Sequence, residues 1–171
     1  MTRSDNSPGD APRAFRERRA TSSAQGSATV LIVDDDPTAR LTLAAILAPD
    51  EYRIVFASDA AEVRQRLARI KPDVIVCDLV MEVMSGDQFF RWLQSSGRWH
   101  FVPIIGVTGF ANDVVRADLL RAGADSVLVK PCNPRELRAH VHAALRTRQK
   151  YRRLAARYLK LTRLRAARVA I

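Results

Sequence analysis

The sequence predicts an α/β protein: a doubly wound parallel sheet of five strands with helices on both faces, followed by an extended C-terminal helix. Short apolar runs rich in Val and Ile alternate with segments of helical periodicity, five of each in about 115 residues. Three of the runs are apolar at nearly every position, as in strands that are buried on both faces. Strict alternation of strand and helix requires parallel strands joined by right-handed crossovers.

The segments between the predicted strands carry the start and stop signals of helices. Asp36 is a good N-cap residue before Pro37, and proline suits the first turn of a helix. Asp59 and Glu62 stand at capping-box spacing, and Gly123 marks the end of the fourth helix. The strands are predicted at residues 29–33, 53–57, 74–77, 102–107 and 126–129, and the helices at 37–47, 59–70, 86–95, 112–122 and from 133 onward.

Length and composition are those of one globular domain with extensions. The chain has 171 residues, of which 47% are hydrophobic. No apolar run reaches the length of a membrane span, and residues 1–30 hold no signal-peptide core. Cys77 and Cys132 are the only cysteines, which favours a reducing compartment over a disulfide framework. We therefore expect a cytoplasmic protein.

The net charge of +10 is concentrated at the C-terminal end. Residues 29–142 hold 13 basic and 15 acidic residues, whereas residues 143–171 hold ten basic residues and no acidic residue. Residues 1–28 lack apolar periodicity and are predicted to form a disordered N-terminal arm. We therefore expect this arm, a folded domain over residues 29–146 and a basic helical extension over residues 147–171.

Charged and polar residues stand at the predicted carboxyl ends of four strands, where a sheet of this type binds its ligands. Asp34 and Asp35 follow the first strand, and Asp78 follows the third. Thr108 ends the fourth strand, and Lys130 follows the fifth. Clustered carboxylates suit a hard divalent cation, above all Mg²⁺, and a hydroxyl with an ammonium group suits a phosphoryl group. Together these residues predict phosphoryl transfer to a carboxylate.

Each of these residues also has a purely structural interpretation. Asp36 is a helix cap, Asp78 alone could be a turn residue, and Lys130 alone could be a solvated strand end. Acidic and basic residues at the ends of several separate strands are much less expected by chance. The combination therefore carries the functional interpretation, and its single members do not.

The same positions lie within motifs of a known family. The motifs are VLIVDDDP at 30–37, DLVMEVMSG at 78–86, VTG at 107–109, GAD at 123–125 and KP at 130–131. In this order they resemble the receiver domain of bacterial two-component response regulators, the CheY-like superfamily, over about residues 29–146. The resemblance implies a flavodoxin-like sheet with strand order 2-1-3-4-5 and a phosphorylatable signalling module.

The resemblance also implies roles for the residues at the strand ends. Asp78 would be the phosphoacceptor, receiving its phosphoryl group from a histidine kinase or a phosphotransfer protein. Thr108 and Lys130 would bind the phosphoryl oxygens, and a cis bond between Lys130 and Pro131 would fix the direction of the lysine. The Mg²⁺ ligands would be Asp34, Asp35, Asp78 and the backbone carbonyl of Val80.

Three departures from the family pattern have consequences. Glu82 stands where the family often has proline, so the loop after the phosphoacceptor is more negative. Val127 replaces an aromatic residue that commonly swings inward, so coupling is expected to run through Thr108 and Phe110 alone. Val80 and Phe110 are apolar and cannot position an attacking water, which predicts slow loss of the phosphoryl group.

The C-terminal helix would span roughly 57 Å if it continued from residue 134 to 171. Tyr151, Leu154, Tyr158 and Leu161 form an apolar seam of two heptads, short of the three or four that identify a coiled coil. Three interpretations remain open: a helix for dimerisation or signalling, a basic arm for nucleic acid or an acidic membrane surface, and a solvated helix without a partner. Ten cations without a carboxylate repel one another, which favours an acidic partner.

A phosphatase is a poor match to the sequence. Asp34 and Asp36 after an apolar strand resemble the first motif of haloacid-dehalogenase-type phosphatases. Those enzymes need a pair of acidic residues after their lysine, whereas Glu136 is the only acidic residue after Lys130. We therefore expect no enzyme activity beyond phosphorylation and dephosphorylation of the receiver itself.

A receiver that regulates nucleic-acid binding through the Arg-rich helix is the alternative function. The basic tail of 29 residues, 143–171, is too short for a helix-turn-helix output domain. We therefore expect the receiver to signal through protein contacts without a conventional output domain.

Overall fold

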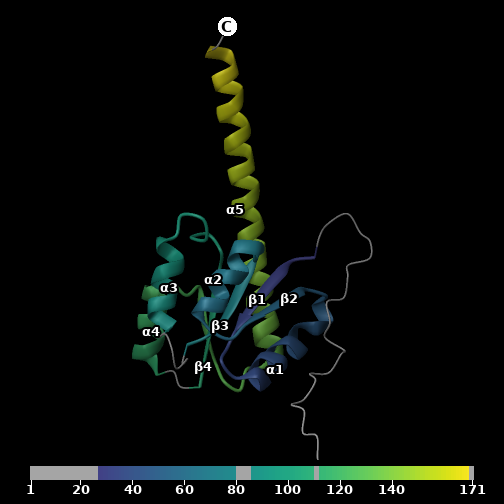
Figure 1. Ribbon diagram of the computed structural model, residues 1–171, viewed down its shortest axis with the longest axis vertical. Helices are drawn as coiled ribbons and strands as arrows, with labels where there is room; N and C mark the ends of the chain where they lie inside the picture. Colours follow the sequence, from purple (N-terminus) through teal and green to yellow (C-terminus); the bar gives the residue numbers. More distant parts are fainter. Residues whose placement is uncertain (1–26, 80–85, 110–111, 170–171) are drawn as a thin grey trace, which may run out of the picture.

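The computed structural model describes residues 27–79, 86–109 and 112–169. The strands are β1 (Thr29–Val33), β2 (Arg53–Ala57), β3 (Val74–Asp78), β4 (Ile104–Thr108) and β5 (Ser126–Val129). The helices are α1 (Pro37–Leu47), the short 3₁₀ helix η2 (Ala48–Asp50), α2 (Ala60–Arg69), α3 (Gly86–Ser95), α4 (Asp113–Ala122) and α5 (Pro134–Val169). Figure 1 shows the central sheet between the helices, with α5 extending far beyond it.

The sheet has the predicted doubly wound topology. All five strands are parallel in the order β2-β1-β3-β4-β5, so the winding direction reverses between β1 and β3. The carboxyl ends of parallel strands meet at one edge of the sheet. Asp34, Asp78 and Thr108 therefore lie at the same edge, on both sides of the reversal.

Alternate strand residues enter two separate hydrophobic cores. In β1, Leu31 and Val33 pack on the face covered by α2, α3 and α4, whereas Val30 and Ile32 pack against α1 and α5. Every residue of β1, β3 and β4 is buried, as predicted for strands that are covered on both faces. Two packed layers thus hold the carboxyl edge of the sheet in place.

The predicted helix signals have their expected roles. Oδ1 of Asp36 accepts the N–H of Thr38 at 2.8 Å and caps α1. Oδ1 of Asp59 accepts the N–H of Glu62 at 2.7 Å and caps α2. Gly123 ends α4 with φ 118, a left-handed conformation that favours glycine.

The predicted limits differ from the structure mainly at β4, which begins two residues later than expected and ends at Thr108. Val102 donates its N–H to the carbonyl of Trp99 at 2.9 Å, so it belongs to the preceding turn. Of the predicted N-terminal arm, only residues 27 and 28 lie within the described part of the chain. The carbonyl of Ala28 accepts the N–H of Arg53 at 3.0 Å, beside the first pair of β1 and β2.

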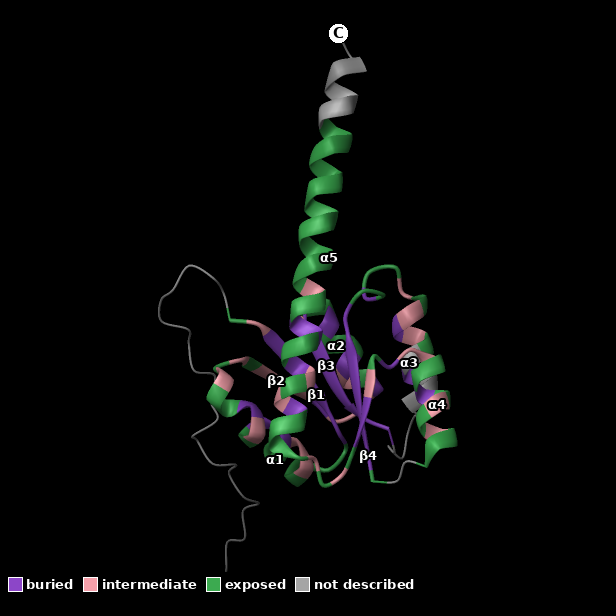
Figure 2. Ribbon diagram, turned by 180° about the vertical axis from the view of Figure 1, so that it is seen from behind, coloured by how far each residue is buried: buried purple, intermediate pink, exposed green. Residues whose placement is uncertain are grey.

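Helix α5 combines a packed first half with a projecting second half. It runs without interruption for 36 residues, a length of about 54 Å. Leu137, Val141 and Leu145 are buried against the sheet, whereas the side chains from Gln149 to Arg163 are exposed. Figure 2 shows this second half standing clear of the domain. No helix in the described part of the chain has both the length and the apolar character needed to cross a membrane.

Candidate functional site

One lysine side chain joins two aspartates at the carboxyl ends of different strands. Nζ of Lys130 lies 2.8 Å from Oδ2 of Asp34 and 2.8 Å from Oδ2 of Asp78. The Asp34 side chain is fully buried and that of Asp78 is nearly so, while 29% of the Lys130 side chain is exposed. The structure therefore brings these three predicted site residues into direct contact.

Asp34 is a carboxylate held in a buried position. Its N–H donates to the carbonyl of Ala57 at 3.2 Å, and its Oδ1 accepts the N–H of Asp36 at 2.9 Å. Burial raises the pKa of Asp34, although its bonds to Lys130 and Asp36 oppose that rise. The nearby charge of Asp78 raises this pKa further. Burial is the largest of these effects, so the folded protein favours the protonated form of Asp34 more than water does.

Lys130 stays charged in this site. Burial disfavours its ammonium form, but the bonds to Asp34 and Asp78 outweigh burial and raise the pKa of Lys130 above its ordinary value. Its peptide bond to Pro131 is cis, as the resemblance implied. Lys130 thus places a permanent positive charge between two carboxylates.

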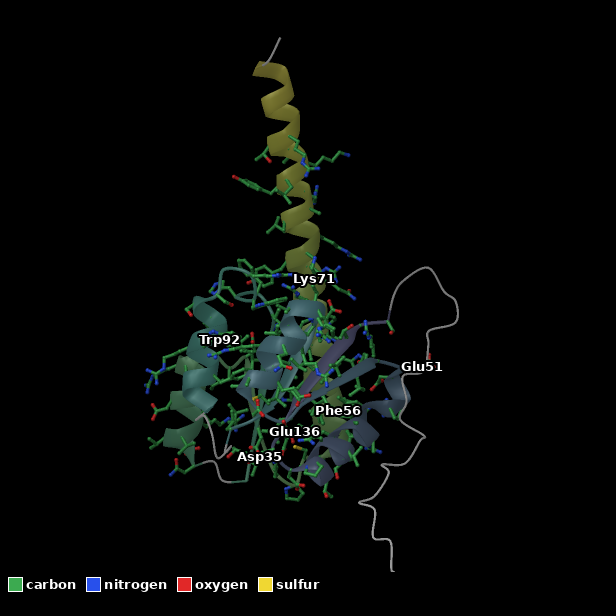
Figure 3. The ribbon with its side chains drawn as sticks, in the orientation of Figure 1. Asp35, Glu51, Phe56, Lys71, Trp92 and Glu136 are labelled. Atoms are coloured by element: carbon green, nitrogen blue, oxygen red, sulfur yellow. The ribbon has the colours of Figure 1, made fainter. Side chains whose placement is uncertain are left out.

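Asp35 completes an acidic cluster with Asp34 and Asp78. Carboxylate oxygens of the three residues lie within 4.8 Å of one another. Asp35 is exposed, whereas the other two are buried, so the cluster opens toward solvent on one side. An all-oxygen set of this size and charge fits a hard divalent cation such as Mg²⁺. Figure 3 shows Asp35 at the end of the domain opposite the projecting half of α5.

Arg40 belongs to the site although sequence reasoning did not identify it. Its guanidinium donates to the carbonyl of Asp34 and, at 3.3 Å, to that of Asp35. These bonds fix the backbone that carries two of the three acidic side chains. The only sequence signal was a cation one turn into the helix that follows the acidic residues.

Thr108 lies at the end of β4 and is 1% exposed. Its carbonyl accepts the N–H of Lys130 at 2.7 Å, which ties it to the lysine through the backbone. Val127 is buried on the α4 face of the sheet, in the core that contains Leu119. The remaining sequence-based predictions for this region concern residues outside the described part of the chain, namely Val80, Glu82 and Phe110.

Comparisons with known proteins agree with this geometry. The family model of the response regulator receiver domain matches residues 30–142. The transcriptional regulatory protein GltR of Pseudomonas aeruginosa is 34% identical over 121 residues, which cover 71% of this chain and 50% of GltR. The sensor histidine kinase TmoS of Ectopseudomonas mendocina is 32% identical over 112 residues, which cover 66% of this chain and 11% of TmoS. The chain thus spans half or less of the length of these relatives.

A solved structure shares the fold and the size of the matched region. The chemotaxis response regulator CheY4 of Vibrio cholerae superposes with a TM-score of 0.65 and 29% identity, covering 70% of this chain and 100% of CheY4. Receiver domains partner with histidine kinases and are generally not enzymes in the conventional sense. From the matched region, the sheet order and the acidic cluster, we conclude that the chain belongs to the response regulator receiver domain family of two-component signalling.

Proposed function

We propose that this receiver accepts a phosphoryl group on Asp78 from a histidine kinase or a phosphotransfer protein and signals through protein contacts. One observation carries the proposal: the ammonium of Lys130 bonds both Asp34 and Asp78 within a three-carboxylate cluster at the carboxyl edge of the sheet. A carboxylate nucleophile beside a fixed cation and a candidate metal site has the groups that phosphoryl transfer requires.

The reaction is a displacement at phosphorus. A carboxylate oxygen of Asp78 attacks the phosphorus of a phosphohistidine, in line with the P–N bond. The new P–O bond forms as the P–N bond breaks, and the leaving imidazole nitrogen keeps the electron pair and takes up a proton. Lys130 balances the negative charge of the phosphoryl oxygens, and its bond to Asp34 keeps the ammonium in the site.

Mg²⁺ fits the donor set of the site. Asp34, Asp35 and Asp78 would hold the ion, and the backbone carbonyl of Val80 is the further ligand expected from the resemblance. When bound, Mg²⁺ supplies positive charge that offsets the charge of the phosphoryl group. The geometry supports this role, since the ammonium of Lys130 bonds two carboxylates of a three-carboxylate cluster.

Thr108 is the residue that we expect to report the phosphoryl group. It is buried at the end of β4, and its carbonyl already bonds the backbone of Lys130. A hydroxyl at this position can donate to a phosphoryl oxygen. Phosphorylation then shifts an existing equilibrium between two arrangements of β4, β5 and the adjoining helices. Val127 has no ring to swing, so the shift depends on Thr108 and its neighbours.

Labelling by acetyl phosphate tests the phosphoacceptor. The full-length protein is incubated with acetyl phosphate and MgCl₂, and the mass of the intact protein is measured for the gain of one phosphoryl group. We expect the wild type and Asp118→Asn, an exposed aspartate on α4, to be labelled alike, and Asp78→Asn to remain unlabelled. Labelling of Asp78→Asn would refute the site, and failure to label the wild type by acetyl phosphate or phosphoramidate would refute the function.

A further inference from the structure

The projecting half of α5 has two chemically distinct faces. Over residues 150–163, at about 100° per residue, the large apolar residues fall within an arc of about 160° and the cations within the opposite arc of about 160°. All of these side chains are exposed, the apolar ones by 49–67%. The apolar face consists of Tyr151, Leu154, Tyr158, Leu159 and Leu161, and the basic face of Lys150, Arg152, Arg153, Arg157, Lys160 and Arg163.

The apolar face begins on the domain itself. The ring of Tyr151 lies 5.4 Å from that of Phe101, which is also half exposed. Two arginines fix this junction: Arg148 donates to the carbonyl of Phe101 at 3.0 Å, and Arg152 bonds Asp73 at 2.8 Å. The result is one continuous exposed apolar strip with a fixed orientation, a feature that marks an interaction surface in a folded protein.

A second copy of the chain is a poor partner for this strip. The seam covers two heptads, and Arg165 and Arg168 occupy the next core positions of the repeat. The flanking positions hold residues such as Arg157 and Thr162, so no acidic side chain could pair with the cations of a partner helix. Because no acidic residue follows Glu136, two such helices would repel each other along their whole length.

Nucleic acid would satisfy only one of the two faces. Phosphates would neutralise the basic face, but the five apolar side chains would stay in water. An anionic bilayer surface satisfies both faces, because the apolar side chains enter the acyl boundary while the flanking cations contact the headgroups. Arg157 and Arg163 flank the apolar arc and have the long stems that allow this.

We propose that residues 150–163 of α5 form an interfacial helix that binds an anionic lipid surface and lies in its plane. The position of the helix keeps the acidic cluster accessible. Its contacts Asp73 and Phe101 precede β3 and β4, at the amino ends of the strands, whereas Asp78 is at the carboxyl edge. Figure 3 shows Lys71, another exposed cation, at the base of the projecting half. A kinase could therefore reach Asp78 while the helix is bound to lipid.

Vesicle co-sedimentation of the full-length protein tests the binding. We expect binding to vesicles that contain phosphatidylglycerol, weak binding to phosphatidylcholine alone, and a decrease with added salt. Arg157→Gln with Arg163→Gln should weaken binding roughly 25-fold, at about a fivefold loss per cation. The matched double variant Arg69→Gln with Arg116→Gln removes two exposed arginines elsewhere and should bind like the wild type.

Two further measurements separate the apolar face from simple charge attraction. Leu154→Gln with Leu161→Gln should weaken binding at least about tenfold, with helicity checked by circular dichroism. On phosphatidylglycerol vesicles, the emission maximum of the tryptophan in Tyr158→Trp should shift to shorter wavelength. The tryptophan in Lys160→Trp, on the basic face, should show no such shift. Equal shifts for both tryptophans, or full binding by the double leucine variant, would refute the insertion of the apolar face.

The remaining outcomes name other partners and would also overturn the proposal. One is that the wild type forms a dimer in light scattering and does not bind vesicles, and that the double leucine variant no longer forms this dimer. Another is duplex DNA binding that survives the leucine substitutions and exceeds vesicle binding. Asp78→Asn should bind vesicles like the wild type, so failure of the phosphoacceptor assignment and failure of the lipid proposal give different results.

Discussion

The backbone N–H of Lys130 donates to the carbonyl of Thr108 at 2.7 Å, while the ammonium of the same lysine bonds Asp34 and Asp78. One residue thus connects the end of β4 with the acidic residues that follow β1 and end β3. A group that binds this ammonium in place of an aspartate would therefore affect the ends of β1, β3 and β4 together.

Replacing Lys130 with Met should leave Asp34 and Asp78 without their shared cation. We expect the free energy of unfolding to fall by about 2 kcal/mol in the absence of Mg²⁺, less than for a fully buried pair because part of the lysine is exposed. Labelling by acetyl phosphate should fall strongly. Urea unfolding with and without MgCl₂ measures the effect, and the loss should be smaller with the ion. An unchanged stability and labelling rate would contradict the role of the ammonium.

Asp34→Asn should increase stability at neutral pH when Mg²⁺ is absent. The folded protein raises the pKa of Asp34 above its ordinary value of 3.8, so the folded state binds this proton more tightly than the unfolded chain does. The contribution of Asp34 is therefore most favourable below pH 3.8 and is lost as the pH rises through the folded pKa. Asparagine resembles the protonated carboxyl, so the advantage of the variant should grow over this range in urea unfolding.

Asp50 provides the opposite case for comparison. Its bond to Arg138, at 2.8 Å, lowers the pKa of Asp50, so its contribution is present above pH 3.8 and is lost as the pH falls through the folded pKa. Asp50→Asn should therefore be less stable than the wild type at neutral pH, and the difference should shrink in acid. Parallel pH profiles for the two variants would refute the assigned causes.

Mg²⁺ should raise the melting temperature of the wild type, because an ion that binds only the folded state stabilises it by mass action. Asp35→Asn should abolish this rise, since Asp35 belongs to the acidic cluster. Asp36→Asn is the matched control: it removes the neighbouring carboxylate, which caps α1, and asparagine caps helices as well as aspartate does. Thermal unfolding across a series of MgCl₂ concentrations measures this rise. An equal rise in melting temperature for the two variants would contradict the proposed metal site.

Gly106→Ala should disturb β4, the strand that pairs with the end of β3 at Asp78, the proposed phosphoacceptor. A Cβ at Gly106 would lie 3.0 Å from Cδ1 of Leu79, the residue after Asp78. We expect the free energy of unfolding to fall by about 1 kcal/mol, because overpacking outweighs the gain from a less flexible backbone. Gly97→Ala, where no atom lies within 4 Å of the added Cβ, should be neutral or slightly stabilising. Denaturant unfolding of both variants checks the difference.

The fold and most of the site followed from patterns that are local in the sequence. Apolar runs that alternate with amphipathic segments defined the layers, and their order fixed which strand ends meet. Asp34, Asp78 and Lys130 could be proposed as site residues because each stands directly after or at the end of an apolar run. Helix caps such as Asp36 and Asp59 could be predicted from the sequence because capping depends on residues two or three positions apart.

Features that depend on tertiary geometry were not accessible in this way. The start of β4 depends on whether Val102 bonds a neighbouring strand or the turn at Trp99, and its sequence fits both. Arg40 bonds the carbonyls of Asp34 and Asp35, which come within reach of its side chain only once α1 has formed. The bond between Arg152 and Asp73 joins residues 79 positions apart, and no local pattern encodes it.

Because α5 is a single unbroken helix from Pro134 to Val169, a tilt of the segment that packs against the sheet would be transmitted along its whole length. About 30 Å of helix extends past Lys150, so a tilt of about 10° at the base would displace the far end by about 5 Å. Its first turn begins four residues after Lys130. A small rearrangement at the lysine would therefore be magnified mechanically at the distant tip.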